Sequence, residues 1–376
     1  MVRLLHLADV HLDASFSAFG DLADSRREEV LDAFRSLPDV AARHEAHAVL
    51  IAGDLFDSPR PRSSTLAATR EAIRRTVESD RPVFIVPGNH DSPTAHPHPY
   101  RRDLGGARVF DAASFGDPAS VSTPGGQLHV YGLAYDAARD REPLSGFRRS
   151  GDPGLHVVLL HAALQESPRW KGSPNSLDVR PEQLRQLDVD YIALGHYHRF
   201  RPPDDFAGDG SIPACYPGSF ADVDLSRGGA SGFALVELRE GEPPRVAHRR
   251  SGVQQVSALG EIDVTELESD AQVADAIAER VDGDSIPVIR LIGSPRFALD
   301  ARLIHEHLCA RFGHARVIDE SLYYSSTRLD EIAGQDTIAG HLVRLGRVRV
   351  GEARDEETRY LADQALRVAL RELGVE

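Results

Sequence analysis

Five apolar segments of this chain each lead into side chains of the kind that bind metal ions, and this feature restricts the fold most strongly. The segments end in the motifs ADVH (Asp9 and His11), GDLFD (Asp54), GNHD (Asn89 and His90), LLHA (His161) and GHYH (His196 and His198). Short, continuous apolar runs of this kind are typical of strands buried on both faces. Because sites in open α/β sheets form beyond the carboxyl ends of the strands, we expect the five motifs to converge.

Residues 1–250 alternate such strands with amphipathic helices, which predicts an α/β fold in layers. The predicted strands are Arg3–Ala8, Ala48–Ala52, Pro82–Val86, Leu128–Leu133, Leu155–Leu160, Tyr191–Leu194 and Gly232–Leu238. Helices are predicted at Ser25–Glu45, where Pro38 should bend or break the helix, and at Thr65–Glu78. A turn at Gly241–Pro244 is expected to lead out of this domain.

The rest of the chain predicts a smaller α+β domain over residues 255–350 and a helical tail over residues 351–376. Its predicted elements are a strand at Ile286–Ile292, a helix at Asp300–Phe312, a strand at Ala315–Asp319 and helices at Thr337–Leu345 and Asp355–Leu373. The last helix carries an apolar stripe through Ala362, Leu366, Ala369, Leu370 and Leu373. That stripe either packs on the chain itself or contacts a partner.

The ligand set predicts two divalent metal ions. Residues two apart on an extended segment point the same way, so Asp-x-His and His-x-His pairs can each bind one ion or bridge two. Nitrogen and oxygen donors without thiolate suit Mn²⁺, Fe²⁺ or Zn²⁺ better than Ca²⁺ or Mg²⁺. The seven predicted ligands are Asp9, His11, Asp54, Asn89, His161, His196 and His198. They are too many for one ion and fit two ions that share a carboxylate, an arrangement that suits phosphoryl transfer to water.

Composition limits the cellular setting more than the substrate. No apolar run reaches the ~20 residues of a membrane span, and Cys215 and Cys309 form no C-x-x-C pair, which fits a reducing cytoplasm. The net charge of −15 is unusual for a DNA-binding protein, although arginines cluster in several loops. The clusters are Arg60/Arg62, Arg101/Arg102, Arg148/Arg149, Arg169/Lys171 and Arg199/Arg201. Net charge therefore neither supports nor excludes a nucleic-acid substrate.

The remaining histidines lack a partner motif, and we expect structural or surface roles for them. His6 is expected to lie on a strand beside the core. The others expected to be structural or on the surface are His44, His47, His129, His156, His248, His305, His307, His314 and His341.

The order of the five motifs resembles the calcineurin-like metallophosphoesterase superfamily. Within it, the segments LLHLADVHLD, VLIAGDLFD, VPGNHD and YIALGHYH are similar to those of DNA-repair exonucleases of the SbcD and YhaO type. The resemblance covers residues 1 to about 240 and implies a four-layer αββα sandwich, followed by a smaller α+β capping domain. It also implies a coiled-coil ATPase partner of the SbcC type, and we expect DNA as the substrate and a homodimer as the assembly.

The resemblance implies a role for each motif residue. Asp9, His11, Asp54 and His198 would bind one ion, and Asp54, Asn89, His161 and His196 would bind the other. His90 would stabilise or protonate the leaving oxygen, and Asp91 would orient His90. Archaeal relatives carry a histidine where this chain has Asp57, so no second acid is expected there. Substrate contacts are expected from the loop arginines Arg60, Arg62, Arg199 and Arg201.

These features favour a metal-dependent phosphodiesterase, and first of all a nuclease acting on DNA ends or single strands. A phosphodiesterase for small substrates such as cyclic nucleotides shares the same motifs, but it needs no additional domain. Protein Ser/Thr phosphatases are disfavoured, because they place Arg-Gly after GDxxD and Glu after GNH, where this chain has Ser58-Pro59 and Asp91. A non-catalytic scaffold would have lost ligands, and this chain retains all of them.

Overall fold

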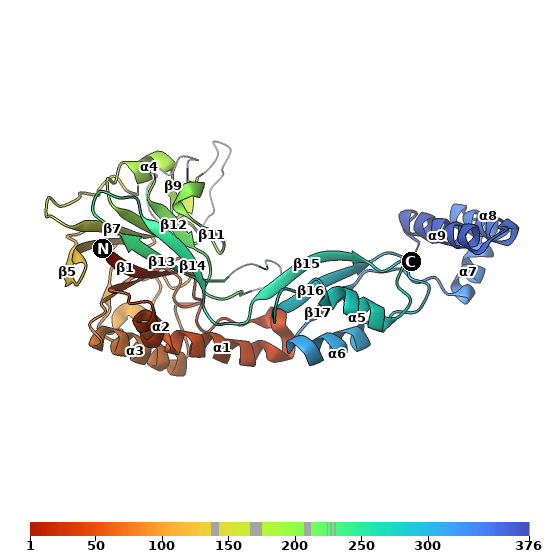
Figure 1. Cartoon of the computed structure of the whole chain (residues 1–376), viewed down its shortest axis with the longest axis horizontal. Coiled ribbons are helices and arrows are strands. Elements are labelled where there is room, and N and C mark those ends of the chain that lie inside the picture. Colours follow the sequence, from red (N-terminus) through yellow and green to blue (C-terminus); the bar gives the residue numbers. More distant parts are fainter. Residues whose placement is uncertain are drawn as a thin grey trace. The chain divides into compact units, whose positions relative to one another are not determined.

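The computed structural model describes residues 1–136, 143–165, 175–206, 212–223, 225, 228 and 231–375. The chain divides into two compact units (Figure 1). The first unit comprises Met1–Leu225 and Gly229–Val253, and the second comprises Ser226–Gly228 and Gln254–Glu376. No helix within the described ranges is long and apolar enough to cross a membrane.

The first unit contains two six-stranded sheets. In spatial order the first sheet consists of β14 (Arg245–Arg250), β13 (Gly232–Leu238), β1 (Val2–Leu7), β2 (Ala48–Ala52), β3 (Val83–Val86) and β4 (Arg108–Val109). The second consists of β11 (Phe200–Arg201), β12 (Ala214–Pro217), β10 (Tyr191–Gly195), β7 (Leu155–His161), β6 (Gly126–Leu133) and β5 (Ala119–Thr123). Strands β1 to β4 are parallel to one another, as are β6, β7, β10 and β12. Each sheet therefore has one edge where several carboxyl ends meet.

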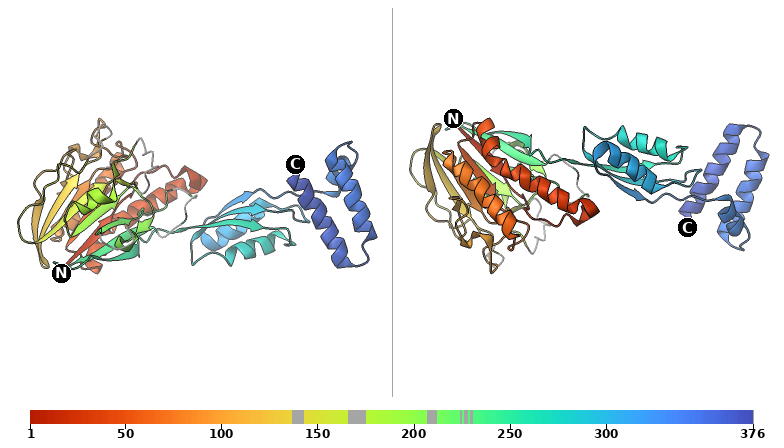
Figure 2. Two further views of the ribbon diagram at one scale, coloured as in Figure 1. Left: turned by 90° about the horizontal axis from the view of Figure 1, so that it is seen from above. Right: turned by 90° about the horizontal axis from the view of Figure 1, so that it is seen from below.

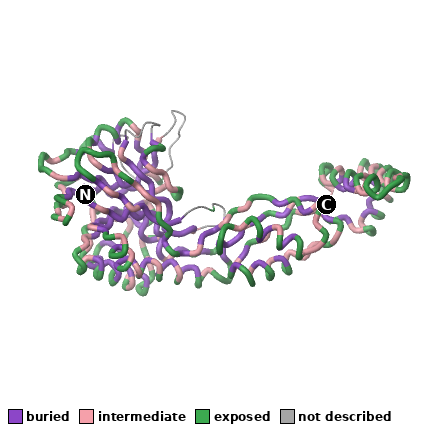
Figure 3. Tube along the Cα trace, in the orientation of Figure 1, coloured by how far each residue is buried: buried purple, intermediate pink, exposed green. Residues whose placement is uncertain are grey.

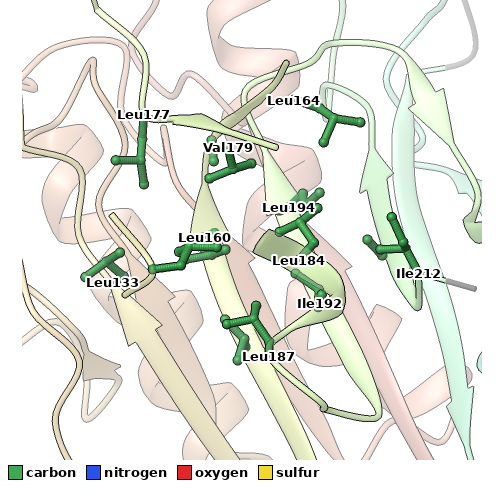
Figure 4. Packing of buried hydrophobic residues seen from close by; sticks show 14 of the residues in the cluster. Leu133, Leu160, Leu164, Leu177, Val179, Leu184, Leu187, Ile192, Leu194 and Ile212 are labelled. Carbon is green, nitrogen blue, oxygen red and sulfur yellow. The ribbon is translucent and has the colours of Figure 1, made fainter. Parts of the chain in front are cut away.

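The two sheets pack face to face around an apolar core. Leu50 and Phe84 of the first sheet share this core with Leu159 of the second sheet. The other face of the second sheet buries a further cluster, in which Leu184 and Leu187 pack near the strands (Figure 4). Leu184 belongs to the short helix α4 (Pro181–Arg185), beside which lies the small pair β8 (Ala163–Leu164) and β9 (Asp178–Val179).

Three helices cover the outer face of the first sheet: α1 (Ala23–Arg35), α2 (Leu37–Arg43) and α3 (Ser63–Glu78) (Figure 2). The predicted helix at Ser25–Glu45 is broken at Ser36, and Pro38 lies in the first turn of α2, where a missing N–H costs no hydrogen bond. Their inward residues, such as Phe34 and Ile73, are fully buried, whereas the outward faces are exposed (Figure 3). The layers are therefore helix, sheet, sheet and helix, which confirms the predicted αββα sandwich.

The turn at Gly241–Pro244 has a different role from the predicted one. It joins β13 to β14, which pair as an antiparallel hairpin from Gly232 opposite Arg250 to Glu237 opposite Arg245. The chain therefore returns along the first sheet after this turn, and the first unit continues to Val253.

The second unit begins with a three-stranded parallel sheet of β15 (Val256–Asp263), β16 (Ile286–Ile292) and β17 (Arg316–Asp319). Helices α5 (Asp270–Ala278) and α6 (Ala301–Phe312) pack on it around Val273, Ile289 and Leu308. The strand at Ile286–Ile292 and the helix at Asp300–Phe312 were predicted within a smaller α+β domain, whereas β15 and α5 were not predicted and all three strands are parallel.

Three further helices end the second unit: α7 (Ser326–Ala333), α8 (Ile338–Glu352) and α9 (Glu356–Glu372). They share an apolar cluster that includes Leu329, Val343, Leu366 and Leu370. The inner part of the predicted apolar stripe thus packs on the chain's own helices. Leu361 of the same helix remains 60% exposed.

Candidate metal centre

All five predicted motifs lie at the carboxyl ends of parallel strands. β1, β2 and β3 of the first sheet lead into the first three motifs, while β7 and β10 of the second sheet lead into the last two. Because the two sheets are packed face to face, both rows of strand ends contribute to one site. The structure brings together the seven predicted ligands Asp9, His11, Asp54, Asn89, His161, His196 and His198, with His90 beside them.

One group of side chains consists of Asp9, His11 and His198, whose ligand atoms all lie within 4.8 Å of one another. His198 Nε2 is 3.8 Å from an oxygen of Asp9, and His11 Nε2 is 3.9 Å from an oxygen of Asp54. Asp54 therefore lies next to this group, as expected of a carboxylate that is a ligand of two ions.

A second group consists of Asp9, Asp54 and His161. His161 Nε2 lies 3.2 Å from Asp54 Oδ2 and 2.9 Å from the amide oxygen of Asn89. His161 Nδ1 donates to the carbonyl of Ala52 at 2.9 Å, which fixes the ring and directs Nε2 into the group. The His196 ring packs edge to face against His161, with centroids 5.3 Å apart.

Glycines allow the two sheets to approach each other at this edge. Gly53 has a φ of +89°, and a Cβ there would lie 2.2 Å from Nδ1 of His161. A Cβ on Gly88 would lie 2.1 Å from Oδ1 of Asp54. Only glycine fits where backbone and ligand side chains are this close, which agrees with the glycines that precede the motif residues.

The carboxylates of the cluster stabilise positive charge on the groups beside them. Burial alone would lower the pKa of His161, but the charge and hydrogen bond of Asp54 outweigh it and raise the pKa to about 10. Burial acts in the opposite direction on Asp54, whose pKa is nevertheless lowered by the charge of His161. In His196 burial wins and lowers the pKa to about 4, so this imidazole stays neutral and keeps a lone pair for a cation.

The donor set fits divalent cations. His11 Nε2 is buried and has no hydrogen-bond partner among the described residues, although it faces the carboxylates of Asp9 and Asp54. A buried nitrogen left without a partner is costly unless an ion uses its lone pair. The side chains that meet here are imidazoles, carboxylates and one amide, a mixture that suits transition-metal ions such as Mn²⁺, Fe²⁺ or Zn²⁺.

Asp57 was not predicted as part of the site, yet it contacts two of its histidines. Its carboxylate lies 3.1 Å from Nδ1 of His11, and its backbone carbonyl accepts from Nδ1 of His90 at 3.0 Å. Each contact directs the opposite ring nitrogen, Nε2, away from Asp57. The feature of the sequence that could have revealed Asp57 is its place as the second carboxylate of the GDLFD motif, three residues after Asp54.

The structure does not bring Asp91 to the His90 ring in the predicted way. The Asp91 carboxylate is fully buried and accepts hydrogen bonds from the backbone of Gly88 at 2.7 Å and Phe56 at 3.1 Å, and from the Tyr100 hydroxyl. Burial and the charge of Asp54 raise the pKa of Asp91 to about 6. These contacts link the loops that carry Asp54 and His90, so Asp91 positions the backbone, while Asp57 contacts the His90 ring.

Of the four predicted substrate arginines, Arg60 and Arg62 lie in the loop after β2, Arg199 lies in the loop after β10, and Arg201 ends strand β11. Arg60 and Arg199 are exposed, and an Arg60 nitrogen donates to the carbonyl of His96 at 3.4 Å. Arg62 pairs with Asp13 at 3.4 Å. Arg201 donates to the carbonyl of Asp205 and stacks on the Phe206 ring. The pair Arg169/Lys171 lies outside the described residues.

Comparison with known proteins agrees with this geometry. The profile of the family described as calcineurin-like phosphoesterase matches residues 2–200. The "Uncharacterized metallophosphoesterase YhaO" of Bacillus subtilis (strain 168) is 26% identical over 306 residues, covering 78% of this chain and 70% of that protein. The "DNA double-strand break repair protein Mre11" of Sulfurisphaera tokodaii is 27% identical over 203 residues, covering 53% of this chain and 49% of that protein.

A protein of the same description from Haloferax volcanii is 27% identical over 333 residues, covering 85% of this chain and 69% of that protein. This chain thus spans about half the length of the Sulfurisphaera relative. The solved structure of a Thermus thermophilus protein, TT1561, covers 66% of this chain and 98% of that protein, at 13% identity and a TM-score of 0.37.

Proposed function

This chain belongs to the calcineurin-like phosphoesterase family, and from that premise we propose that it is a two-metal phosphodiesterase that cleaves DNA at ends or in single strands. The main support for this proposal is that five strand ends from two sheets converge on one group of carboxylates and imidazoles. Relatives described as DNA double-strand break repair proteins support DNA as the substrate.

The residues divide between two ions that share Asp54. Asp9, His11, Asp54 and His198 would hold one ion, and Asp54, Asn89, His161 and His196 would hold the other. The contact of His161 with both Asp54 and Asn89 supports the second set. Divalent ions bound there would activate a water molecule and neutralise charge on the phosphoryl oxygens. We propose Mn²⁺ as the bound ion. Fe²⁺ and Zn²⁺ are further candidates, because they also bind nitrogen and oxygen ligands of this kind.

His90 would act on the leaving oxygen. Its side chain is 45% exposed at the rim of the cluster, where a substrate can reach it. Nδ1 is engaged by the Asp57 carbonyl, so Nε2 is the atom that can donate a proton or stabilise negative charge. The backbone N–H of His90 donates to Asp54 at 2.9 Å, which holds this rim residue beside the shared carboxylate.

Two features of the molecule that hydrolysis of a small diester does not require favour a polymer substrate. Arg60, Arg62 and Arg199 are exposed in loops that follow the metal-ligand motifs, where they can contact successive phosphates. The second unit adds a separate fold with its own apolar core. Hydrolysis of cyclic nucleotides is the competing activity, and it requires neither feature.

We also propose that an ATPase with a coiled coil, of the SbcC type, binds the helices at the end of the second unit. An apolar groove lies between α8 and α9, lined by residues that include Leu342, Leu345, Leu361 and Ala362. A helix of a partner could place its own apolar face there. The expected homodimer and the cytoplasmic location remain predictions.

The decisive experiment is a hydrolysis panel with Mn²⁺. Single-stranded, duplex and hairpin DNA would be compared with bis-p-nitrophenyl phosphate and cyclic nucleotides, using wild type and the His90→Asn variant. We expect DNA cleavage by the wild type and its loss in the variant. Turnover of cyclic nucleotides without DNA cleavage would establish the competing activity, and no turnover of any substrate would contradict a phosphodiesterase.

A further inference from the structure

Two side chains of types that can bind metal ions, His305 and Cys309, lie in contact on α6 of the second unit. His305 and Cys309 are four residues apart, so they lie on the same face of the helix, one turn from each other. His305 Nε2 is 3.3 Å from Sγ of Cys309. Both residues are partly exposed, so an ion in solution can reach them.

The end of the helix brings a third side chain to this pair. Gly313 has a φ of +76° and donates its backbone N–H to the carbonyl of Cys309 at 2.9 Å, which ends α6 in a tight turn. The chain then folds back so that the ring of His314 lies edge-on to the ring of His305, with centroids 6.1 Å apart. Two imidazoles and one thiol therefore lie near one another toward the end of α6.

Their separation is close to that of ligands on one tetrahedral ion. Zn–S bonds of about 2.3 Å and Zn–N bonds of about 2.0–2.1 Å place nitrogen and sulfur roughly 3.6 Å apart at a tetrahedral angle. The observed separation of Nε2 and Sγ is 3.3 Å, so a small adjustment of the two side chains suffices. The ligand atoms of the three side chains are not grouped as closely as those of the catalytic cluster. The His314 side chain would therefore have to rotate to become the third ligand, and a water molecule would complete the coordination.

We propose that His305, Cys309 and His314 form a site for a soft divalent ion such as Zn²⁺, separate from the phosphoesterase centre. Thiolate and imidazole together select such ions, whereas the other centre offers nitrogen and oxygen alone. Binding joins α6 to the segment that enters β17 and stabilises the second unit. Burial raises the pKa of the Cys309 thiol, and a backbone hydrogen bond from Ala315 opposes this in part, so binding releases a proton.

Cobalt provides a spectroscopic test, because a thiolate bound to Co²⁺ gives a sulfur-to-metal charge-transfer absorption. The chain has two cysteines, and Cys215 is 0% exposed within the core of the first unit. Neither cysteine belongs to the catalytic cluster, so such a band reports on Cys309 alone. The chelator-treated full chain would be titrated with Co²⁺ as wild type and as the variants Cys309→Ser, His305→Gln and His314→Gln. His307→Gln, an exposed histidine on the same helix, is the matched control.

We expect a saturable band in the wild type and in His307→Gln, no band in Cys309→Ser, and at least tenfold weaker binding in His305→Gln and His314→Gln. Zn²⁺ should remove the band by competition. The Asp54→Asn variant should retain it, which separates this site from the phosphoesterase centre. A wild type without the band, or a band that survives Cys309→Ser, would overturn the proposal. Unchanged affinity in His314→Gln would overturn the three-ligand site.

Discussion

Four of the predicted ligands hold their backbone in the left-handed region, which non-glycine residues rarely adopt. The φ angles are 48° at Asp9, 49° at His11, 50° at Asp54 and 105° at His196. Each such residue costs about 1–3 kcal/mol and persists only where the surroundings fix it. Here the loop after β1 is fixed by backbone hydrogen bonds from Asp9 to Gly53 and from His11 to Asp54. These backbone conformations direct side chains from neighbouring loops toward the same point.

At the residue scale, Asp57 should position His11 for metal binding. Removing its carboxylate in Asp57→Ala frees the His11 ring, so we expect metal affinity to fall by about 10–100-fold. Asp57→Asn keeps an oxygen that accepts from Nδ1 and should restore most of the affinity. Metal titration of the three proteins measures this, and equal affinity of Asp57→Ala and wild type would contradict a positioning role.

Buried His6 should make the fold sensitive to acid. Its side chain is fully buried, its Nδ1 lies 2.9 Å from the Tyr191 hydroxyl, and burial lowers its pKa to about 3. The unfolded chain therefore binds one more proton than the folded chain between about pH 3 and 6.5. As the pH falls through this window, the free energy of unfolding decreases by roughly 1 kcal/mol per pH unit from this residue alone.

The uncharged variant His6→Gln should lose that part of the pH dependence, and exposed His307→Gln should keep it. Denaturant unfolding of chelator-treated protein between pH 4.5 and 6.5 gives the slopes. If His6→Gln and wild type show the same slope, His6 does not cause the acid sensitivity.

At the scale of elements, the continuous apolar runs were enough to predict several of the buried and partly buried strands. The predicted strands at Ala48–Ala52, Gly232–Leu238 and Ile286–Ile292 have the observed bounds. β15 was missed because much of it is exposed and its register with β16 shifts between Ala258 and Gly260. Short-range patterns also could not show that β14 returns beside β13, since a hairpin and an exit from the domain begin with the same turn.

The residues of the candidate site could also be predicted only in part, because some of them depend on local sequence and others on how loops pack. A ligand that follows a buried strand is visible in the sequence, because strand and motif are adjacent. The contacts of Asp57 and Asp91 depend on how two loops lie against each other, which no local pattern contains. The pairing of His305 with Cys309 likewise appears only once the helix is known.

The junction of the two sheets depends on Gly195 at the end of β10. A Cβ there would lie 1.8 Å from the carbonyl oxygen of Ala52, which is backbone and cannot rotate away. We expect Gly195→Ala to force the sheets apart and to lower stability by about 1–3 kcal/mol or more. Gly116→Ala, whose new Cβ would have no atom of the described residues within 4 Å, is the control. Thermal or denaturant unfolding measures both, and equal stability of the two variants would contradict the close approach.

At the scale of the whole molecule, a net charge of −15 must be reconciled with a polyanionic substrate. Arginines that follow β2 and β10 in the chain would supply the local attraction for phosphates that the total charge does not. Replacing Arg60, Arg62, Arg199 and Arg201 by Gln should weaken DNA cleavage and flatten its dependence on salt. Hydrolysis of bis-p-nitrophenyl phosphate should stay near wild type, because a small diester needs no extended contacts.

A variant with Arg70, Arg74 and Arg75 of α3 and Arg35 of α1 replaced by Gln removes the same four charges from the outer helices and is the control. It should cleave DNA like the wild type. Equal losses on DNA and on the small diester in the loop variant would indicate damage to the metal centre and count against a polymer-binding role.

In the proposed function, Asp54 joins two ions in one catalytic centre while His90 acts on the substrate. Elemental analysis of Mn²⁺ bound per chain, measured together with hydrolysis in wild type, Asp54→Ala and His90→Ala, tests it most directly. We predict two ions and full activity in the wild type, no bound ions and no activity in Asp54→Ala, and two ions with at least roughly 100-fold slower turnover in His90→Ala. A His90→Ala variant that loses its metal, or an Asp54→Ala variant that keeps both ions, would contradict this division of roles between Asp54 and His90.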